Sequence, residues 1–171
     1  EIMSSFEIYG GNRLKGELIP QGAKNEALQV LCATLLTDEK VTISNIPNIQ
    51  DINRLINLLI GLGVKVEKIN EDTYSFQADN VDFSYMQTKE FVEQANRLRG
   101  SIMILGPTLG RFHKGAAPSP GGDKIGRRRL DTHFIGFQKL GATIDYSSQY
   151  SLYIAKADEL VGTYMLLDEA S

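Results

Sequence analysis

The chain has 171 residues, enough for one domain with a sizeable core, and its 42% apolar and 23% charged residues exclude a disordered or collagen-like protein. Its one cysteine, Cys32, excludes an internal disulfide and a cysteine-rich zinc cluster and favours a cytoplasmic protein. No apolar run approaches the ~20 residues of a membrane span, so we expect no membrane partner. The net charge of −3 and the isoelectric point near 5.4 argue against a nucleic-acid groove.

The first predicted elements are two strands, residues 6–9 and 14–19, on either side of a Gly-Gly-Asn turn. Apolar residues at helical spacing predict a helix over 23–36, and alternation of apolar and polar residues predicts a strand over 41–46. A second helix is expected over 51–62, with Asp51 as its cap and Gly63 as the glycine that ends it. Strands over 64–69 and 74–77 complete an α-β-α-β-β unit.

The same order of elements recurs in the second half of the chain. A helical stretch ending in residues 102–109 leads to a strand near 113–117, then to a helix from 131 to 140 and strands over 142–146 and 152–155. The repeated α-β-α-β-β unit is longer than a solenoid repeat. Its recurrence predicts a compact α/β domain of duplicated units with mixed sheets. Residues 163–167 have the pattern of the first strand of a third unit, which the chain does not complete.

Lys24 lies in the segment QGAKN, residues 21–25, between a predicted strand and the first predicted helix. The positive end of the helix dipole disfavours a cation there, so a lysine at this place indicates a bound phosphate or carboxylate. A solvated lysine without a ligand is the alternative. The spacing of glycines and lysine excludes a Walker P-loop.

Positive charge is concentrated between residues 97 and 133. This window holds eight basic residues and only two acids, Asp123 and Asp131, and so carries +6 in a chain whose total is −3. Within it, the segment PSPGGDKIGRRRLD, residues 118–131, has the composition of an exposed lid or binding loop. An anion would relieve the repulsion of its three arginines, although a solvated charge run is also possible. Asp123 is either a general acid or an ion-pair partner.

The histidines and the cysteine do not predict chemistry. His113 and His133 are 20 residues apart without an acidic or cysteine partner at ligand spacing, so we expect polar packing residues and no metal site. Cys32 lies on the apolar side of a predicted helix, which indicates an inert core thiol.

Three separated motifs together resemble one family. The segments QGAKNEAL at 21–28, RGSI at 99–102 and PGGDKIGRRRLDTH at 120–133, followed by LGA at 140–142, are similar to the UDP-N-acetylglucosamine 1-carboxyvinyltransferases, the enolpyruvyl transferases that open bacterial peptidoglycan synthesis. The resemblance implies an inside-out α/β barrel domain of repeated α-β-α-β-β units, here truncated. It assigns residues 1–20 to strands of a domain completed by a missing C-terminal half. Residues 21–171 would then form most of the other domain, with two repeats and the start of a third.

The resemblance also implies the site residues. Lys24 and Asn25 match the pair that holds phosphoenolpyruvate, and Arg128 matches a loop arginine that reaches the same ligand. Asp123 stands where the family has a loop cysteine and keeps a proton donor there, so the implied catalytic residues are Asp123, Lys24 and Arg128. Many members have proline at the position of Arg129 and a basic residue at that of Glu169. The residues implied to bind UDP-N-acetylglucosamine are Arg99, Arg128, Arg129, Leu130, Asp131, Thr132, Glu169, Ala170 and Ser171.

The implied reaction moves the enolpyruvyl group of phosphoenolpyruvate to the 3′-hydroxyl of UDP-N-acetylglucosamine and releases phosphate, by addition and elimination without a metal or cofactor. An aspartate at the cysteine position implies insensitivity to fosfomycin, which alkylates that cysteine. The chain alone is expected to be an inactive fragment whose partner is the rest of its own protein. The alternatives are the sibling transferase of the shikimate pathway and a non-catalytic anion-binding or RNA-binding module.

Overall fold

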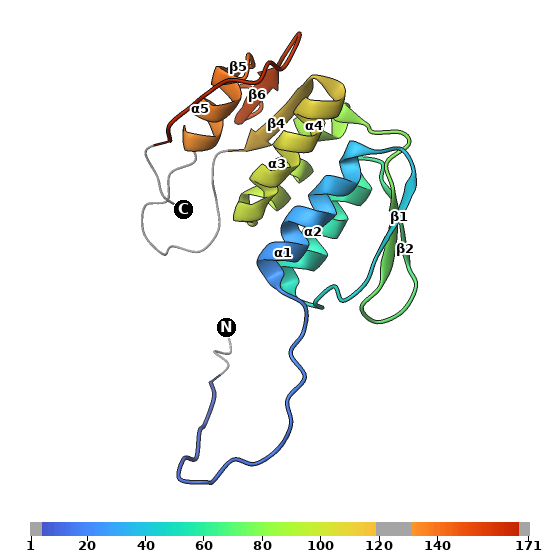
Figure 1. The fold of residues 1–171 in the computed structure, drawn as a ribbon, viewed down its shortest axis with the longest axis vertical. Helices are drawn as coiled ribbons and strands as arrows, with labels where there is room; N and C mark the ends of the chain where they lie inside the picture. The colour runs from blue at the N-terminus through green and yellow to red at the C-terminus, as the bar shows by residue number, and fades with distance from the viewer. Residues whose placement is uncertain (1–4, 119–130, 168–171) are drawn as a thin grey trace.

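The computed structural model describes residues 5–118 and 131–167, which form two successive α/β units (Figure 1). The first unit contains helix α1 (Lys24–Ala33), the 3-10 helix η1 (Thr34–Leu36), β1 (Lys40–Ile43), α2 (Gln50–Gly61), β2 (Lys65–Lys68) and β3 (Tyr74–Gln77). The connection contains the 3-10 helix η2 (Phe83–Gln87) and α3 (Lys89–Asn96). The second unit contains the 3-10 helix η3 (Arg99–Ile104), α4 (Leu105–Phe112), β4 (Lys114–Pro118), α5 (Asp131–Lys139), β5 (Thr143–Ser147) and β6 (Leu152–Lys156).

The repeat predicted from the sequence is confirmed by the sheets. The first sheet has the order β1-β3-β2 and the second has the equivalent order β4-β6-β5. Strands β2 and β3 begin at residues 65 and 74, and β5 and β6 begin at 143 and 152, an offset of 78 in both cases. Every pairing between described strands is antiparallel, so the parallel part of the expected mixed sheets is missing from this portion of the chain.

Helices α1 and α2 lie in the middle of the molecule with the first sheet at one edge, whereas α5 lies at the other edge beside β5 and β6 (Figure 1). Helix α2 is amphipathic and buries Leu55, Leu58 and Leu59 completely, whereas half of the side chains of β1 and most of those of β2 face solvent. One large apolar cluster extends from the first unit to Ala116 and Leu152 of the second, so the two units share a core. No helix within the described ranges is both long and apolar enough to cross a bilayer.

Arg111 holds the two units together. Its Nη1 atom donates hydrogen bonds to the carbonyl oxygens of Leu35 at 3.1 Å, Thr37 at 2.8 Å and Ala78 at 2.8 Å, all in or next to the first unit. The guanidinium also lies over the ring of Phe112, 4.6 Å from its centroid. A charged donor therefore satisfies three carbonyl groups at the end of η1 and of β3.

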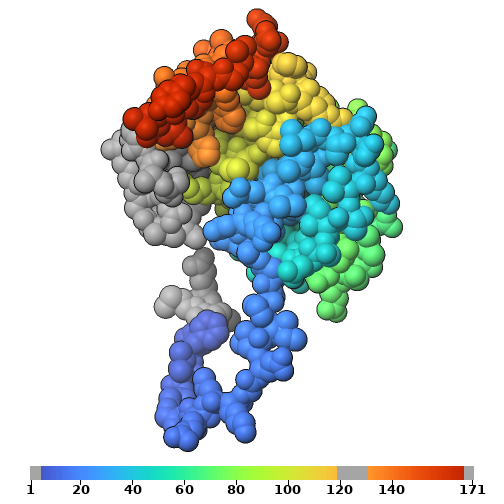
Figure 2. Space-filling view, in the orientation of Figure 1, coloured from blue at the N-terminus to red at the C-terminus, as the bar shows by residue number. Residues whose placement is uncertain are grey.

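The strands predicted at residues 6–9, 14–19 and 163–167 are not formed in the described structure. Residues 5–23 contain no helix or strand and extend away from the body of the molecule (Figure 2). Their apolar side chains are exposed, with Phe6 at 96% and Leu18 at 84%, and Tyr164 is also exposed. A strand needs the N–H and C=O groups of a neighbouring strand, and no described strand pairs with these segments.

Two helix ends follow the sequence prediction closely. Gly63 adopts φ +91° after α2, and Gly141 adopts φ +107° after α5, a left-handed region that favours glycine. At Gly63 a Cβ atom would also overlap the carbonyl oxygen of Asn80. The two glycines thus direct each helix into the strand that follows it, β2 or β5.

Candidate functional site

The start of helix α1 is fixed by a close contact between backbones. A Cβ atom on Gly22 would overlap the carbonyl oxygen of Asn45, so only glycine fits there. Asn45 itself has φ +59°, a conformation that asparagine tolerates better than most residues. The contact between the two loops places Lys24 and Asn25, both exposed, in the first turn of α1. Ala23 precedes them and carries no polar side chain to cap the first N–H groups of the helix.

Lys24 forms an ion pair with Asp51, the first acidic residue of α2. The Lys24 Nζ atom lies 3.1 Å from the Asp51 Oδ2 atom, and their side chains are 47% and 32% exposed. Asp51 was expected to cap α2, and this was wrong, because the N-cap position is Ile49 and Asp51 lies inside the first turn. From there its carboxylate offsets both the positive end of α2 and the ammonium group of Lys24. The unfavourable cation at the start of α1 therefore has a compensating partner within the chain.

Arg54 and the start of η3 lie next to the Lys24–Asp51 ion pair. The Arg54 Nη1 atom lies 3.9 Å from the Asp51 Oδ1 atom and donates a 3.5 Å hydrogen bond to the carbonyl oxygen of Arg97. Three residues further on, Gly100 packs against α1, since a Cβ atom there would come within 2.9 Å of Leu28 Cδ1. Arg99 lies between these two contacts at the first position of η3. The structure thus gathers Lys24, Asp51, Arg54 and the 97–100 segment, and we call this group the α1 cluster.

Asp51 and Arg54 were not predicted from the sequence as members of this cluster. They are one helical turn apart at the polar start of α2, the spacing at which an acid and a base form an ion pair. That pattern was a usable signal for a charged group, but it did not indicate Lys24 as the third member.

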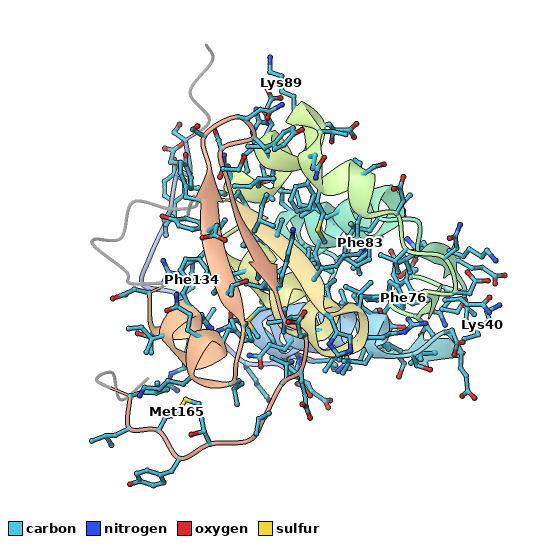
Figure 3. All side chains as sticks on the ribbon, turned by 90° about the horizontal axis from the view of Figure 1, so that it is seen from above. Lys40, Phe76, Phe83, Lys89, Phe134 and Met165 are labelled. Atoms are coloured by element: carbon cyan, nitrogen blue, oxygen red, sulfur yellow. The ribbon has the colours of Figure 1, made fainter. Side chains whose placement is uncertain are left out.

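Asp131 and Thr132 are in the first turn of α5. This helix is anchored on the second sheet through Phe134, whose ring centroid lies 4.7 Å from that of Tyr153 (Figure 3). Tyr153 in turn contacts Tyr146 at 5.1 Å. In Figure 1 the start of α5 lies apart from the start of α1.

Several candidate residues lie outside the described residues. They are Asp123, Arg128, Arg129, Leu130, Glu169, Ala170 and Ser171. Their assignment rests on the sequence. Within the described ranges no group of three or more His, Cys, Asp or Glu side chains is arranged to hold a metal ion. Cys32 is buried, and burial raises the pKa of its thiol to about 12, as expected for an inert core cysteine.

Residues 8–171 match the protein family described as EPSP synthase (3-phosphoshikimate 1-carboxyvinyltransferase). UDP-N-acetylglucosamine 1-carboxyvinyltransferases of Bacteroides thetaiotaomicron and Porphyromonas gingivalis are each 57% identical to this chain over 99% of its length. The corresponding protein of Borreliella burgdorferi is 40% identical over 99% of the chain. This chain spans 39% of the length of the first two relatives and 38% of the third.

The fold is also found in a solved structure, the enolpyruvyl transferase NikO from Streptomyces tendae. The two structures superpose with a TM-score of 0.70 at 19% sequence identity, over 89% of this chain and 32% of that one. At this level of identity the likeness establishes the fold.

Proposed function

This chain belongs to the EPSP synthase family, and on that premise we propose that the protein containing it is a UDP-N-acetylglucosamine 1-carboxyvinyltransferase. It would transfer the enolpyruvyl group of phosphoenolpyruvate to the 3′-hydroxyl of UDP-N-acetylglucosamine and release phosphate, a step of peptidoglycan synthesis. The observation that carries the proposal is the 57% identity, over 99% of the chain, to relatives that bear this name. The single cysteine, which is buried, fits a cytoplasmic enzyme.

In this proposal the start of α1 binds phosphoenolpyruvate. The ligand carries a phosphate and a carboxylate, and both suit the Lys24 ammonium group and the outward-pointing N–H groups of the first turn. Asn25 and Arg128 complete this part of the site. Asp51 accepts one hydrogen bond from the Lys24 ammonium group, and the other two hydrogens of this group are left to bind the anion.

The acceptor would bind alongside, between Arg99, the start of α5 and the 169–171 segment. Asp123 protonates the methylene carbon of phosphoenolpyruvate, and the sugar 3′-hydroxyl adds to the neighbouring carbon while its proton passes to water. The phosphate then leaves with the electrons of its carbon–oxygen bond, and the methyl group returns a proton to the Asp123 carboxylate, which restores the double bond. The cationic groups stabilise the charge that develops on the phosphate.

The proposed architecture divides the chain near residue 20. Residues 1–20 would pair with strands elsewhere in the longer protein, and residues 21–171 would form most of one domain. The exposed apolar side chains of Phe6, Leu14 and Leu18 support this division, because a sheet would bury them. The cleft of the proposed enzyme is formed by two domains, and the 171-residue chain supplies only one of its walls. We therefore expect that the chain alone does not turn over phosphoenolpyruvate.

A second candidate acceptor is shikimate 3-phosphate, because the matched family is described by that activity. The experiment that separates the two is phosphate release from phosphoenolpyruvate by the full-length protein, measured with each acceptor in turn. We expect release that depends on UDP-N-acetylglucosamine. Release with shikimate 3-phosphate instead would favour the sibling reaction, and release with neither would favour a non-catalytic binding module.

A further inference from the structure

A cavity of about 320 Å³ lies between η2 and the face of the second sheet that carries Ala116 and Leu152. Phe83 and Met86 line it from η2, and Ala116, Leu152 and Ile154 line it from β4 and β6. Successive side chains of a strand point to opposite faces, so this face is the one opposite to Tyr153 and α5. Figure 3 shows Phe83 and Phe134 on different sides of the sheet.

The cavity is bordered by two lysines that face each other across neighbouring strands. Lys114 and Lys156 are direct partners in the β4–β6 register, and both line the cavity. Like charges directly opposite each other in an antiparallel pair destabilise the sheet. None of the described residues that line the cavity is acidic, and the nearest carboxylate on this face of the sheet is that of Asp145 on β5, the residue directly opposite Ile154.

The aromatic wall of the cavity is already fixed in place. The ring of Phe83 packs edge-on against Phe112, with centroids 5.2 Å apart. The Lys114 Nζ atom lies 4.6 Å from the centroid of the Phe83 ring, which directs this ammonium group over the cavity. The apolar wall and the cationic rim of the cavity are therefore already formed, and no side chain has to move to create them.

We propose that this cavity binds a small organic anion. The apolar body of the ligand fills the space against Phe83, Met86 and Ile154, and its carboxylate or phosphate lies between Lys114 and Lys156. The volume admits a body of about ten non-hydrogen atoms, because a water molecule in the liquid occupies about 30 Å³. Of the residues implied to bind phosphoenolpyruvate or the sugar nucleotide, none that lies within residues 5–118 and 131–167 lines the cavity, so we treat it as a site separate from that of the proposed reaction.

The test uses 3-phenylpropionate as the probe and the full-length protein labelled with ¹³C at the methionine methyl groups. Met86 lines the cavity, whereas Met103 and Met165 do not and serve as internal references. We expect a saturable shift of the Met86 resonance, with an affinity in the millimolar range, while the reference resonances stay in place. The uncharged 3-phenylpropionamide and inorganic phosphate each lack one half of the ligand, so neither should saturate at the same concentrations.

Charge removal provides the second arm of the test. The double variant Lys114→Gln and Lys156→Gln should bind 3-phenylpropionate about tenfold more weakly or worse, because it loses two charge-assisted contacts. Lys68→Gln is the matched control, since Lys68 is a strand lysine over an aromatic ring, Tyr74, in the first unit. The absence of a Met86 shift, equal binding of the amide, or unchanged affinity of the double variant would each overturn the proposal.

Discussion

Replacing Asp51 with asparagine removes the carboxylate charge that lies 3.1 Å from Lys24 and 3.9 Å from Arg54 while it nearly keeps the size of the side chain. The Lys24–Asp51 pair is 47% and 32% exposed, and partly exposed pairs of this kind contribute about 0.2–1 kcal/mol. The free energy of unfolding should therefore fall by less than about 1 kcal/mol. The larger consequence is expected in substrate binding, because Asp51 holds the side chain that is proposed to bind phosphoenolpyruvate.

Two effects on the binding of phosphoenolpyruvate oppose each other in Asp51→Asn. A Lys24 side chain that is no longer held must be ordered when the substrate binds, which costs about 0.5–1.5 kcal/mol. The variant also loses the repulsion between Asp51 and the nearer anionic group of the substrate, which for one unit charge at about 6 Å in water is worth about 0.7 kcal/mol and is reduced by about half in physiological salt. The ordering cost exceeds this gain, and a net loss of about 0.6 kcal/mol corresponds to an increase in KM of about threefold.

The assay is steady-state phosphate release by the full-length protein at saturating UDP-N-acetylglucosamine, with phosphoenolpyruvate varied. Glu26→Gln is the matched control, because Glu26 is in the same turn of α1 and forms no ion pair with Lys24 in the described part of the chain. Its KM for phosphoenolpyruvate should stay at the wild-type value. An unchanged or lower KM in Asp51→Asn would refute the positioning role of Asp51.

Of four further predictions, two concern the loop acid Asp123, one concerns the contact between the units and one concerns the buried thiol. Asp123→Asn in the full-length protein should slow turnover about 10²-fold or more if Asp123 is the general acid, and a near-wild-type rate would remove it from the mechanism. The unmodified protein should resist fosfomycin, and Asp123→Cys should acquire time-dependent inactivation; covalent inhibition of the unmodified protein would contradict this. Arg111→Met should lower the free energy of unfolding by about 3 kcal/mol, measured in urea, because three carbonyl groups lose a charged donor, while the exposed Lys139→Met should change little. Cys32, whose pKa is raised to about 12, stays protonated at pH 8, so peptide mapping should find it unreacted with iodoacetamide in the native protein and alkylated in urea.

The repeated units were predictable because their signals are local. The apolar stripe of α2 and the left-handed glycines after α2 and α5 are encoded within a few residues, and they fixed the order of helices and strands in both units. The position of Lys24 at the start of a helix was predictable for the same reason.

The contacts that assemble the site were not predictable in this way because they join distant parts of the chain. Lys24 and Asp51 are separated by 27 residues, and Arg111 and Thr37 by 74. A pattern within one window does not indicate which of 18 basic residues meets which acid or carbonyl group.

The strands expected at 6–9, 14–19 and 163–167 were predicted from the sequence but are not formed in the described structure. Alternation of apolar and polar residues indicates that a segment suits a sheet, but a strand forms only where another strand pairs with it. In the described structure these segments have no such partner, and their apolar side chains are exposed.

Phosphate release by the Lys24→Met variant tests most directly whether the start of α1 binds phosphoenolpyruvate. The full-length variant should lose about 10²–10³-fold in UDP-N-acetylglucosamine-dependent release, because a charged group that stabilises the departing phosphate is gone. The control Glu26→Gln should keep the wild-type rate. A rate for Lys24→Met within about threefold of the wild type, well short of the loss expected for such a group, would contradict the assignment of this site.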